Sequence, residues 1–257
     1  MKKANKTCVC ILEFDRFDPD EFLALLTPLR RSTIESISSE RAGMQSAAAE
    51  LAYLAAAKAA HEDGLFGEED AKALHTDELI KRFQYSYAEN GQPVLSGAFM
   101  SLSHTSGAAL AAVSSRPIGA DIERERRVSE RISKRIMSPK EYARFILLPE
   151  YEKNAVLLEC WTAKESFLKL TGEGILGGLN RLEYDGANAK IIDGRSERSA
   201  HVIRLDSGLK SREERESRGE GARDRGICAC ICCESGSEPR VLRFLSAQAA
   251  AGFVLNN

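Results

Sequence analysis

The sequence contains Trp161-Thr162-Ala163-Lys164-Glu165-Ser166-Phe167-Leu168-Lys169-Leu170-Thr171-Gly172 near the middle of its 257 residues. We expect a helix over 155–170 that stops at Gly172, because glycine commonly follows the last helical residue. On such a helix Glu165 and Lys169 are four residues apart and share a face, while the apolar residues pack inward. An isolated pair of this kind is usually only a surface feature. Its interest depends on the acidic motif that precedes it.

That acidic motif is the run Ile118-Gly119-Ala120-Asp121-Ile122-Glu123. Side chains alternate on a strand, so Asp121 and Glu123 project from the same face. Two neighbouring carboxylates repel each other unless a cation lies between them, and oxygen ligands of this kind suit magnesium. The motif therefore indicates either a magnesium site or a strand end with two solvated acids.

A third cluster is the small-residue run Ser101-Leu102-Ser103-His104-Thr105-Ser106-Gly107. Hydroxyls, backbone N–H groups and an imidazole at a strand end can form a phosphate cradle. The alternative is a turn histidine with a local hydrogen bond. A serine hydrolase is disfavoured, because neighbouring residues on a strand point apart and the Gly-x-Ser-x-Gly pattern is missing.

The remaining pattern predicts an α+β protein. We expect helices over 19–29 and 38–60 and a helix start at Ser138-Pro139-Lys140-Glu141, where a serine cap precedes a proline. Short strands are predicted over 8–12, 101–103, 108–113 and 118–122. A terminal antiparallel sheet is predicted from 182–184, 189–192, 201–205, 227–233 and 241–245. The segment 207–225 is almost entirely Ser, Gly, Glu, Arg and Asp, which predicts a flexible insertion.

Composition excludes several classes of protein. The formal net charge of -2 gives no global attraction to nucleic acid or to an anionic membrane. The apolar run after the basic start is too short for a signal peptide, and no stretch approaches a membrane span. We therefore expect a cytoplasmic protein whose seven cysteines are reduced thiols.

Taken in order, five motifs resemble the 4'-phosphopantetheinyl transferase superfamily, in the larger single-chain form typified by the surfactin-synthetase activator. They are Gly91-Gln92-Pro93, Leu102-Ser103-His104-Thr105, Gly119-Ala120-Asp121-Ile122-Glu123, Met137-Ser138-Pro139-Lys140-Glu141-Tyr142 and Trp161 to Lys169. The resemblance implies a monomer with a pseudo-twofold pair of similar α/β subdomains, antiparallel sheets and a ligand cleft between them. The halves would be 1–115, on the coenzyme A side, and 116–257, with most of the metal site.

The resemblance also implies an activity and roles for individual residues. The enzyme would transfer 4'-phosphopantetheine from coenzyme A to a serine of an apo acyl or peptidyl carrier protein, releasing 3',5'-adenosine bisphosphate. Glu165 and Lys169 would be catalytic, with His104 a weaker candidate for the base. The magnesium ligands would be Asp121, Glu123 and Glu165, and coenzyme A would contact Ser103, His104, Lys164 and Lys169.

Some features depart from the family pattern or remain open. Gln92 stands where relatives commonly have lysine, and the arginine expected near Gln45 is absent, although Arg41 lies one turn away. These departures leave a catalytically weak carrier-binding relative as the alternative. The arginine-rich segment 124–135 is either a docking surface for acidic carriers or a solvated helix face.

The cysteines near the C-terminus suggest one more alternative, a thiolate metal-binding protein. Cys228, Cys230, Cys232 and Cys233 follow a Cys-x-Cys-x-Cys-Cys pattern on a predicted strand, which does not place all four sulfurs on one face. Structural zinc usually requires paired Cys units from two loops. A core strand is therefore the favoured interpretation.

Overall fold

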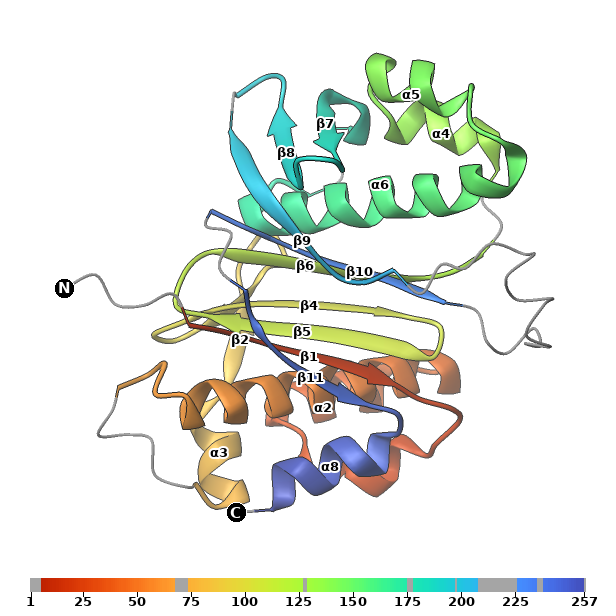
Figure 1. Cartoon of the computed structure of the whole chain (residues 1–257). Helices are drawn as coiled ribbons and strands as arrows, with labels where there is room; N and C mark the ends of the chain where they lie inside the picture. Colours follow the sequence, from red (N-terminus) through yellow and green to blue (C-terminus); the bar gives the residue numbers. More distant parts are fainter. Residues whose placement is uncertain are drawn as a thin grey trace. The chain divides into compact units, whose positions relative to one another are not determined.

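The computed structural model describes residues 6–67, 74–126, 129–174, 178–196, 198–207, 226–234 and 238–256. They form two compact units (Figure 1): the described residues of Met1–Ile118 and Ser237–Asn257 form the first, and those of Gly119–Gly236 the second. Both units combine helices with mainly antiparallel sheets, which confirms the predicted α+β class. None of the helices in the described part of the chain is long and apolar enough to cross a membrane.

The first unit is built on a four-stranded sheet of order β11-β1-β5-β4. Strand β1 is antiparallel to β5 and parallel to β11. Gly91, with a φ of 80°, turns the chain between β2 and β3. The elements are β1 (Thr7–Glu13), η1 (Pro19–Leu25), α1 (Pro28–Ser36), α2 (Glu40–Glu62), α3 (Thr76–Arg82), β2 (Tyr85–Tyr87), β3 (Pro93–Leu95), β4 (Phe99–Thr105), β5 (Ala108–Ser114), β11 (Arg240–Phe244) and α8 (Ala247–Leu255).

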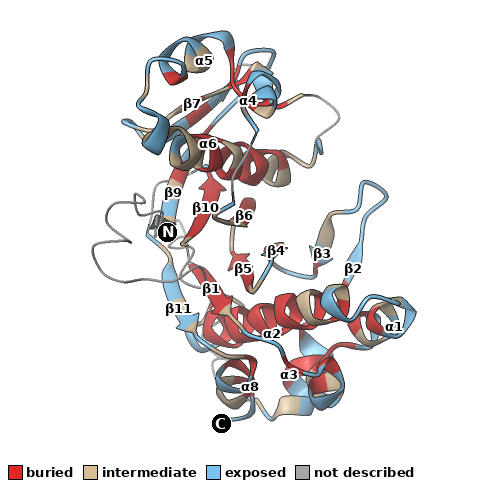
Figure 2. Ribbon diagram, turned by 90° about the vertical axis from the view of Figure 1, so that its right-hand side faces the viewer, coloured by how far each residue is buried: buried red, intermediate tan, exposed pale blue. Residues whose placement is uncertain are grey.

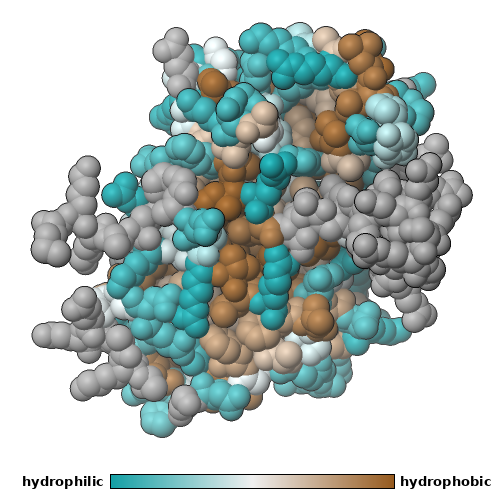
Figure 3. Space-filling view, viewed as in Figure 1, coloured by the Kyte–Doolittle hydropathy of each residue, from teal (hydrophilic) through white to brown (hydrophobic). Residues whose placement is uncertain are grey.

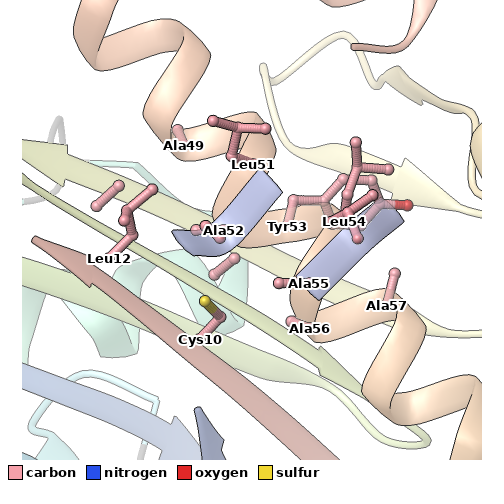
Figure 4. Close-up of a cluster of buried hydrophobic side chains, with 14 of the residues drawn as sticks. Cys10, Leu12, Ala49, Leu51, Ala52, Tyr53, Leu54, Ala55, Ala56 and Ala57 are labelled. Atoms are coloured by element: carbon pink, nitrogen blue, oxygen red, sulfur yellow. The ribbon is translucent and has the colours of Figure 1, made fainter. Parts of the chain in front are cut away.

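Helix α2 is the centre of the first core. Ser39 caps its start by accepting a hydrogen bond from the Ala42 backbone N–H. The sheet covers one side of α2, and helices α1, α3 and α8 lie against others, so the helix is buried all round over most of its length. Figure 2 shows this burial, and Figure 4 shows the small alanine side chains of α2 that face Cys10 and Leu12 of β1. Small side chains allow the helix backbone to lie close to the strands.

The second unit is built on a five-stranded sheet of order β6-β10-β9-β8-β7, with α6 packed against β10. Helix α6 ends as predicted at Gly172, which adopts a φ of 74°. The elements are β6 (Ile118–Arg124), α4 (Glu130–Ile136), α5 (Pro139–Phe145), α6 (Glu150–Thr171), η4 (Leu179–Arg181), β7 (Leu182–Asp185), β8 (Lys190–Asp193), β9 (Ser199–Ser207) and β10 (Ile227–Cys233).

The two units share an order of elements. In each, a first strand is followed by a long helix and then by antiparallel strands. The last of these strands lies beside the first strand, so β5 is next to β1 and β10 is next to β6. This similarity is what a pair of related halves requires. The predicted division at 115/116 and the cleft stay predictions.

Two predicted elements differ from the structure. The helix expected over 19–29 is a 3-10 helix that ends at Leu25, and Pro28 begins α1. Proline has no N–H and holds the preceding residue extended, so one continuous helix cannot form there. The segment 241–245 was expected in the terminal antiparallel sheet, but β11 pairs in parallel with β1 in the first unit. Alternation of apolar and polar residues predicts that a segment is a strand, but it does not predict which other strand it pairs with.

The cysteine-rich strand is part of the core, as predicted. All four cysteines of β10 are free and buried, and three of them pack in the second hydrophobic core. Ser166 donates a hydrogen bond to the Cys232 sulfur over 3.0 Å. Burial raises the pKa of the Cys232 thiol to about 12, so this thiol is kept protonated. The predicted insertion 207–225 lies outside the described residues, apart from Ser207.

Candidate active site

The site begins where β6 touches α6. A Cβ atom added to Gly119 would lie 1.8 Å from the Ser166 carbonyl oxygen and 2.4 Å from the Leu170 backbone nitrogen. Only glycine fits such an approach between two backbones. Because strand side chains alternate, this approach brings Asp121 and Glu123 toward the turn of α6 that carries Glu165 and Lys169.

An acidic cluster, formed by Asp121, Glu123 and Glu165, occupies this junction. Asp121 is 5% exposed and Glu165 is 8% exposed, so both carboxylates are buried. Lys169 donates to Asp121 Oδ1 over 2.7 Å and is the counter-ion nearest the strand. Glu165 Oε1 is buried and has no hydrogen-bond partner within the described residues. A buried oxygen of this kind is rare in folded proteins and indicates a ligand site.

The three carboxylates of the acidic cluster influence one another's ionisation. Burial and the Asp121 charge raise the pKa of Glu165 to about 7, although Lys169 acts in the opposite direction. Burial and Asp121 likewise raise the pKa of Glu123 to about 7, against Arg126 and Lys169. The cluster therefore holds more negative charge than its two bases compensate, and it favours either protons or another cation.

The donor set of the cluster suits a hard divalent cation, because every donor is a carboxylate oxygen and Glu165 Oε1 is buried without a hydrogen-bond partner among the described residues. In the described part of the chain, however, no group of three or more Asp, Glu, His or Cys side chains is arranged to hold a metal ion. Lys169 is placed against Asp121 instead. Magnesium ligation by Asp121, Glu123 and Glu165 therefore stays a prediction.

Lys164 has a different place from the one the sequence suggests. Its side chain is fully buried, and its ammonium group donates to the Ile136 carbonyl over 2.7 Å and to Glu141 Oε2 over 2.6 Å. Glu141 also accepts from the Ser138 and Tyr184 backbone N–H groups. This lysine faces away from solvent and joins α6 to the start of α5, and its contact with coenzyme A stays a prediction.

Ser103 and His104 lie on β4 in the first unit, and they do not share a face. Ser103 is buried whereas His104 is exposed, as alternation along a strand requires. Arg41 is exposed in the first turn of α2, and Gln92 accepts a hydrogen bond from Asn90 in the β2–β3 turn. These positions are compatible with solvent access for His104 and for Gln92.

Several contacts at the site were not predicted. They are the close packing of Gly119, the pairing of Glu141 with Lys164, and the contacts of Arg126. Arg126 lies over the Trp161 ring and beside Glu123. A glycine inside a strand pattern is a recognisable sign of close backbone approach, but the pairings of Glu141 with Lys164 and of Arg126 with Trp161 join residues more than 20 positions apart.

A comparison with protein families matches a region that includes the residues of the acidic cluster. Residues 117–224 match the family model of the 4'-phosphopantetheinyl transferase superfamily. The resemblance of this chain to that superfamily is thus confirmed.

Several individual proteins that are similar to this chain are named 4'-phosphopantetheinyl transferases. 4'-Phosphopantetheinyl transferase HetI of Nostoc sp. is 39% identical over 101 residues, 36% of this chain and 43% of that protein. 4'-Phosphopantetheinyl transferase psf-1 of Bacillus pumilus is 36% identical over 104 residues, 38% and 45% of the two chains. 4'-Phosphopantetheinyl transferase Sfp of Bacillus subtilis is 31% identical over 135 residues, 49% and 60% of the two chains. The match thus spans from under half to three fifths of each relative.

Proposed function

We propose that this protein transfers the 4'-phosphopantetheine arm of coenzyme A to a serine of an apo acyl or peptidyl carrier protein and releases 3',5'-adenosine bisphosphate. The observation that supports this best is the acidic cluster at the β6–α6 junction, which lies inside the region matched by the superfamily model. A site that transfers a phosphate group needs positive charge beside the diphosphate. The carboxylates of the acidic cluster would supply this charge by binding a cation.

We propose Asp121, Glu123 and Glu165 as the residues that would hold magnesium. When bound, the ion would offset the charge of the diphosphate and of the leaving group. Lys169 is one turn beyond Glu165 on α6, and its side chain is 32% exposed, so it can also reach an anionic substrate. In this role Lys169 would stabilise negative charge as it grows on the leaving oxygen.

Glu165 is the proposed general base, directly or through a water that it orients. In the absence of a metal ion, burial first and then Asp121 raise the pKa of Glu165 to about 7. A metal ion held by this carboxylate would lower that pKa and favour the ionised form, which is the form that accepts a proton. The carrier serine would lose its proton to this carboxylate as its oxygen attacks phosphorus. His104 stays a weaker candidate, and we propose Ser103 and His104 as contacts for the coenzyme A phosphates.

The carrier protein would dock on the exposed basic face of the second unit. Arg131, Lys134 and Arg135 on α4 and Lys140 and Arg144 on α5 are all exposed. Hydrophobic side chains reach the surface near α5 (Figure 3), and the exposed large ones there include Ile146 and Leu147. Carriers that are acidic around their modified serine would be attracted to such a face. We propose a cytoplasmic monomer that acts on these carriers.

Intact-mass spectrometry tests this function. Apo carrier proteins incubated with the protein, coenzyme A and magnesium should gain one phosphopantetheine, roughly 340 Da by covalent addition. Glu165→Gln should lower the rate by about 10²-fold or more, as the loss of one preorganised charged group does. Glu152→Gln changes the same charge in the first turn of the same helix and should act like wild type. A folded protein that modifies no carrier would overturn the proposal and favour a binding-only relative.

A further inference from the structure

Arg126 connects the acidic cluster to the surface of α6. Its Nη2 atom lies 3.4 Å from Glu123 Oε2, and its guanidinium carbon lies 5.5 Å from the centre of the Trp161 ring. The side chain therefore touches an acid on β6 and an aromatic ring on α6 at once. Trp161 is the single tryptophan of the chain, so the protein has one indole reporter at this position.

Both contacts of Arg126 are weak enough to break. The Arg126 side chain is 51% exposed, whereas that of Glu123 is 15% exposed. Ion pairs with one solvated partner contribute little, and the cation–π contact adds a similarly small amount. Lys169 differs, because its pair with Asp121 is shorter, at 2.7 Å, and more buried. Of these two bases, Arg126 is the one that can leave the cluster at lower cost.

Charge balance determines what happens when a cation enters. With all carboxylates ionised, Asp121, Glu123 and Glu165 contribute three negative charges, and Arg126 and Lys169 contribute two positive ones. A divalent cation would turn this small negative excess into a positive one while both bases remain. Repulsion within a partly buried site then acts on the most loosely held base. A monovalent cation would produce no such positive excess.

We infer that Arg126 is a displaceable counter-ion of the acidic cluster, which neutralises Glu123 in the absence of a divalent cation and leaves both Glu123 and Trp161 when one binds. This inference rests on the proposed metal site. It makes Arg126 a positioning residue that keeps the cluster compact when empty and lowers its affinity for divalent cations by competition. Exposure of the Trp161 ring to water reports the exchange.

The test uses the full chain, without coenzyme A or carrier, titrated with magnesium chloride at constant ionic strength. Wild type should show a saturable red shift of Trp161 emission as the ring loses its guanidinium cover. Arg126→Gln should bind magnesium by calorimetry about two- to fivefold more tightly, as expected for removing an exposed ion pair, without that emission shift. Arg131→Gln removes the same charge from an exposed position on α4 and should follow wild type in both measurements.

Three results would overturn the inference. One is an emission shift that persists in Arg126→Gln, and another is unchanged or weaker magnesium binding by that variant. The third is the absence of magnesium binding to wild type. The carrier modification assay on wild type, run separately, shows whether the transferase proposal stands or fails with it, because that assay does not depend on the position of Arg126.

Discussion

Each unit contains a buried glutamate on its long helix, and the two differ in their surroundings. Glu50 on α2 is 0% exposed, and its carboxylate accepts from Thr27, Arg30 and Tyr85 at distances of 2.5 to 3.4 Å. Glu165 on α6 is 8% exposed, and its Oε1 atom has no hydrogen-bond partner among the described residues. Glu50 and Glu165 are thus alike in residue type and burial, but hydrogen-bond donors surround the Glu50 carboxylate and do not reach Glu165 Oε1 within the described residues.

The difference teaches how a structural acid is distinguished from a functional one. Donors surround Glu50, so its charge is compensated inside the fold. The acids Asp121 and Glu123 lie near Glu165, and together with burial they raise its pKa to about 7. A fold gains nothing by placing three acids together unless another partner arrives. The Glu50 network is therefore the one we assign to stability, and the acidic cluster is the one we propose for function.

Removal of the Glu50 charge should produce the largest effect. Glu50→Gln leaves the guanidinium group of Arg30, a side chain only 9% exposed, without its counter-charge. Breaking a buried pair by removing one partner costs about 3 to 5 kcal/mol. Urea unfolding should therefore show a much lower free energy of unfolding for this variant.

The control for Glu50→Gln is Glu40→Gln on the same helix. Its partner Arg16 is 79% exposed and Glu40 is 59% exposed, so this change should cost less than about 1 kcal/mol. Equal losses in the two variants would show that the burial of the Glu50 network adds nothing, and the contrast with Glu165 would disappear.

The sequence could predict elements but not the partners of their side chains. Glycine and serine caps, helix formers and alternation were sufficient for α2, the start of α5 and the end of α6 at Gly172, because these signals act within a few residues. The parallel pairing of β11 with β1 joins segments more than 200 residues apart. Nothing local encodes that choice, since either sheet could satisfy the same strand pattern.

The lysines of α6 illustrate the same limit. Lys164 and Lys169 both belong to the motif over 161–169, and the family resemblance implies contacts with coenzyme A for both. The structure buries Lys164 against Glu141 and leaves Lys169 partly exposed beside Asp121. Five positions on a helix are enough to turn a side chain onto a different neighbour, so the motif alone does not predict which of its lysines is buried and which reaches solvent.

Removal of the Glu165 charge should change stability in the opposite direction to removal of the Glu50 charge. In the absence of divalent cations, Glu165→Gln should stabilise the protein at pH 8, because it removes one of three mutually repelling charges. After solvent screening is allowed for, we expect a gain of about 1 kcal/mol in the free energy of unfolding. Denaturant unfolding with a chelator present measures it. A loss of stability comparable to that of Glu50→Gln would mean that both glutamates serve the fold.

The smallest expected effect is on the pH dependence of the free energy of unfolding. The pKa values of Glu123 and Glu165 rise from 4.5 to about 7 in the folded protein, first by burial. Between these values the folded protein binds more protons than the unfolded chain, so these two groups make the free energy of unfolding fall as pH rises from 4.5 to 7. The Glu123→Gln/Glu165→Gln double variant lacks both titrations and should show a flatter slope in metal-free thermal unfolding. If its slope equals that of wild type, the acidic cluster is not under strain, and the distinction from Glu50 loses its electrostatic basis.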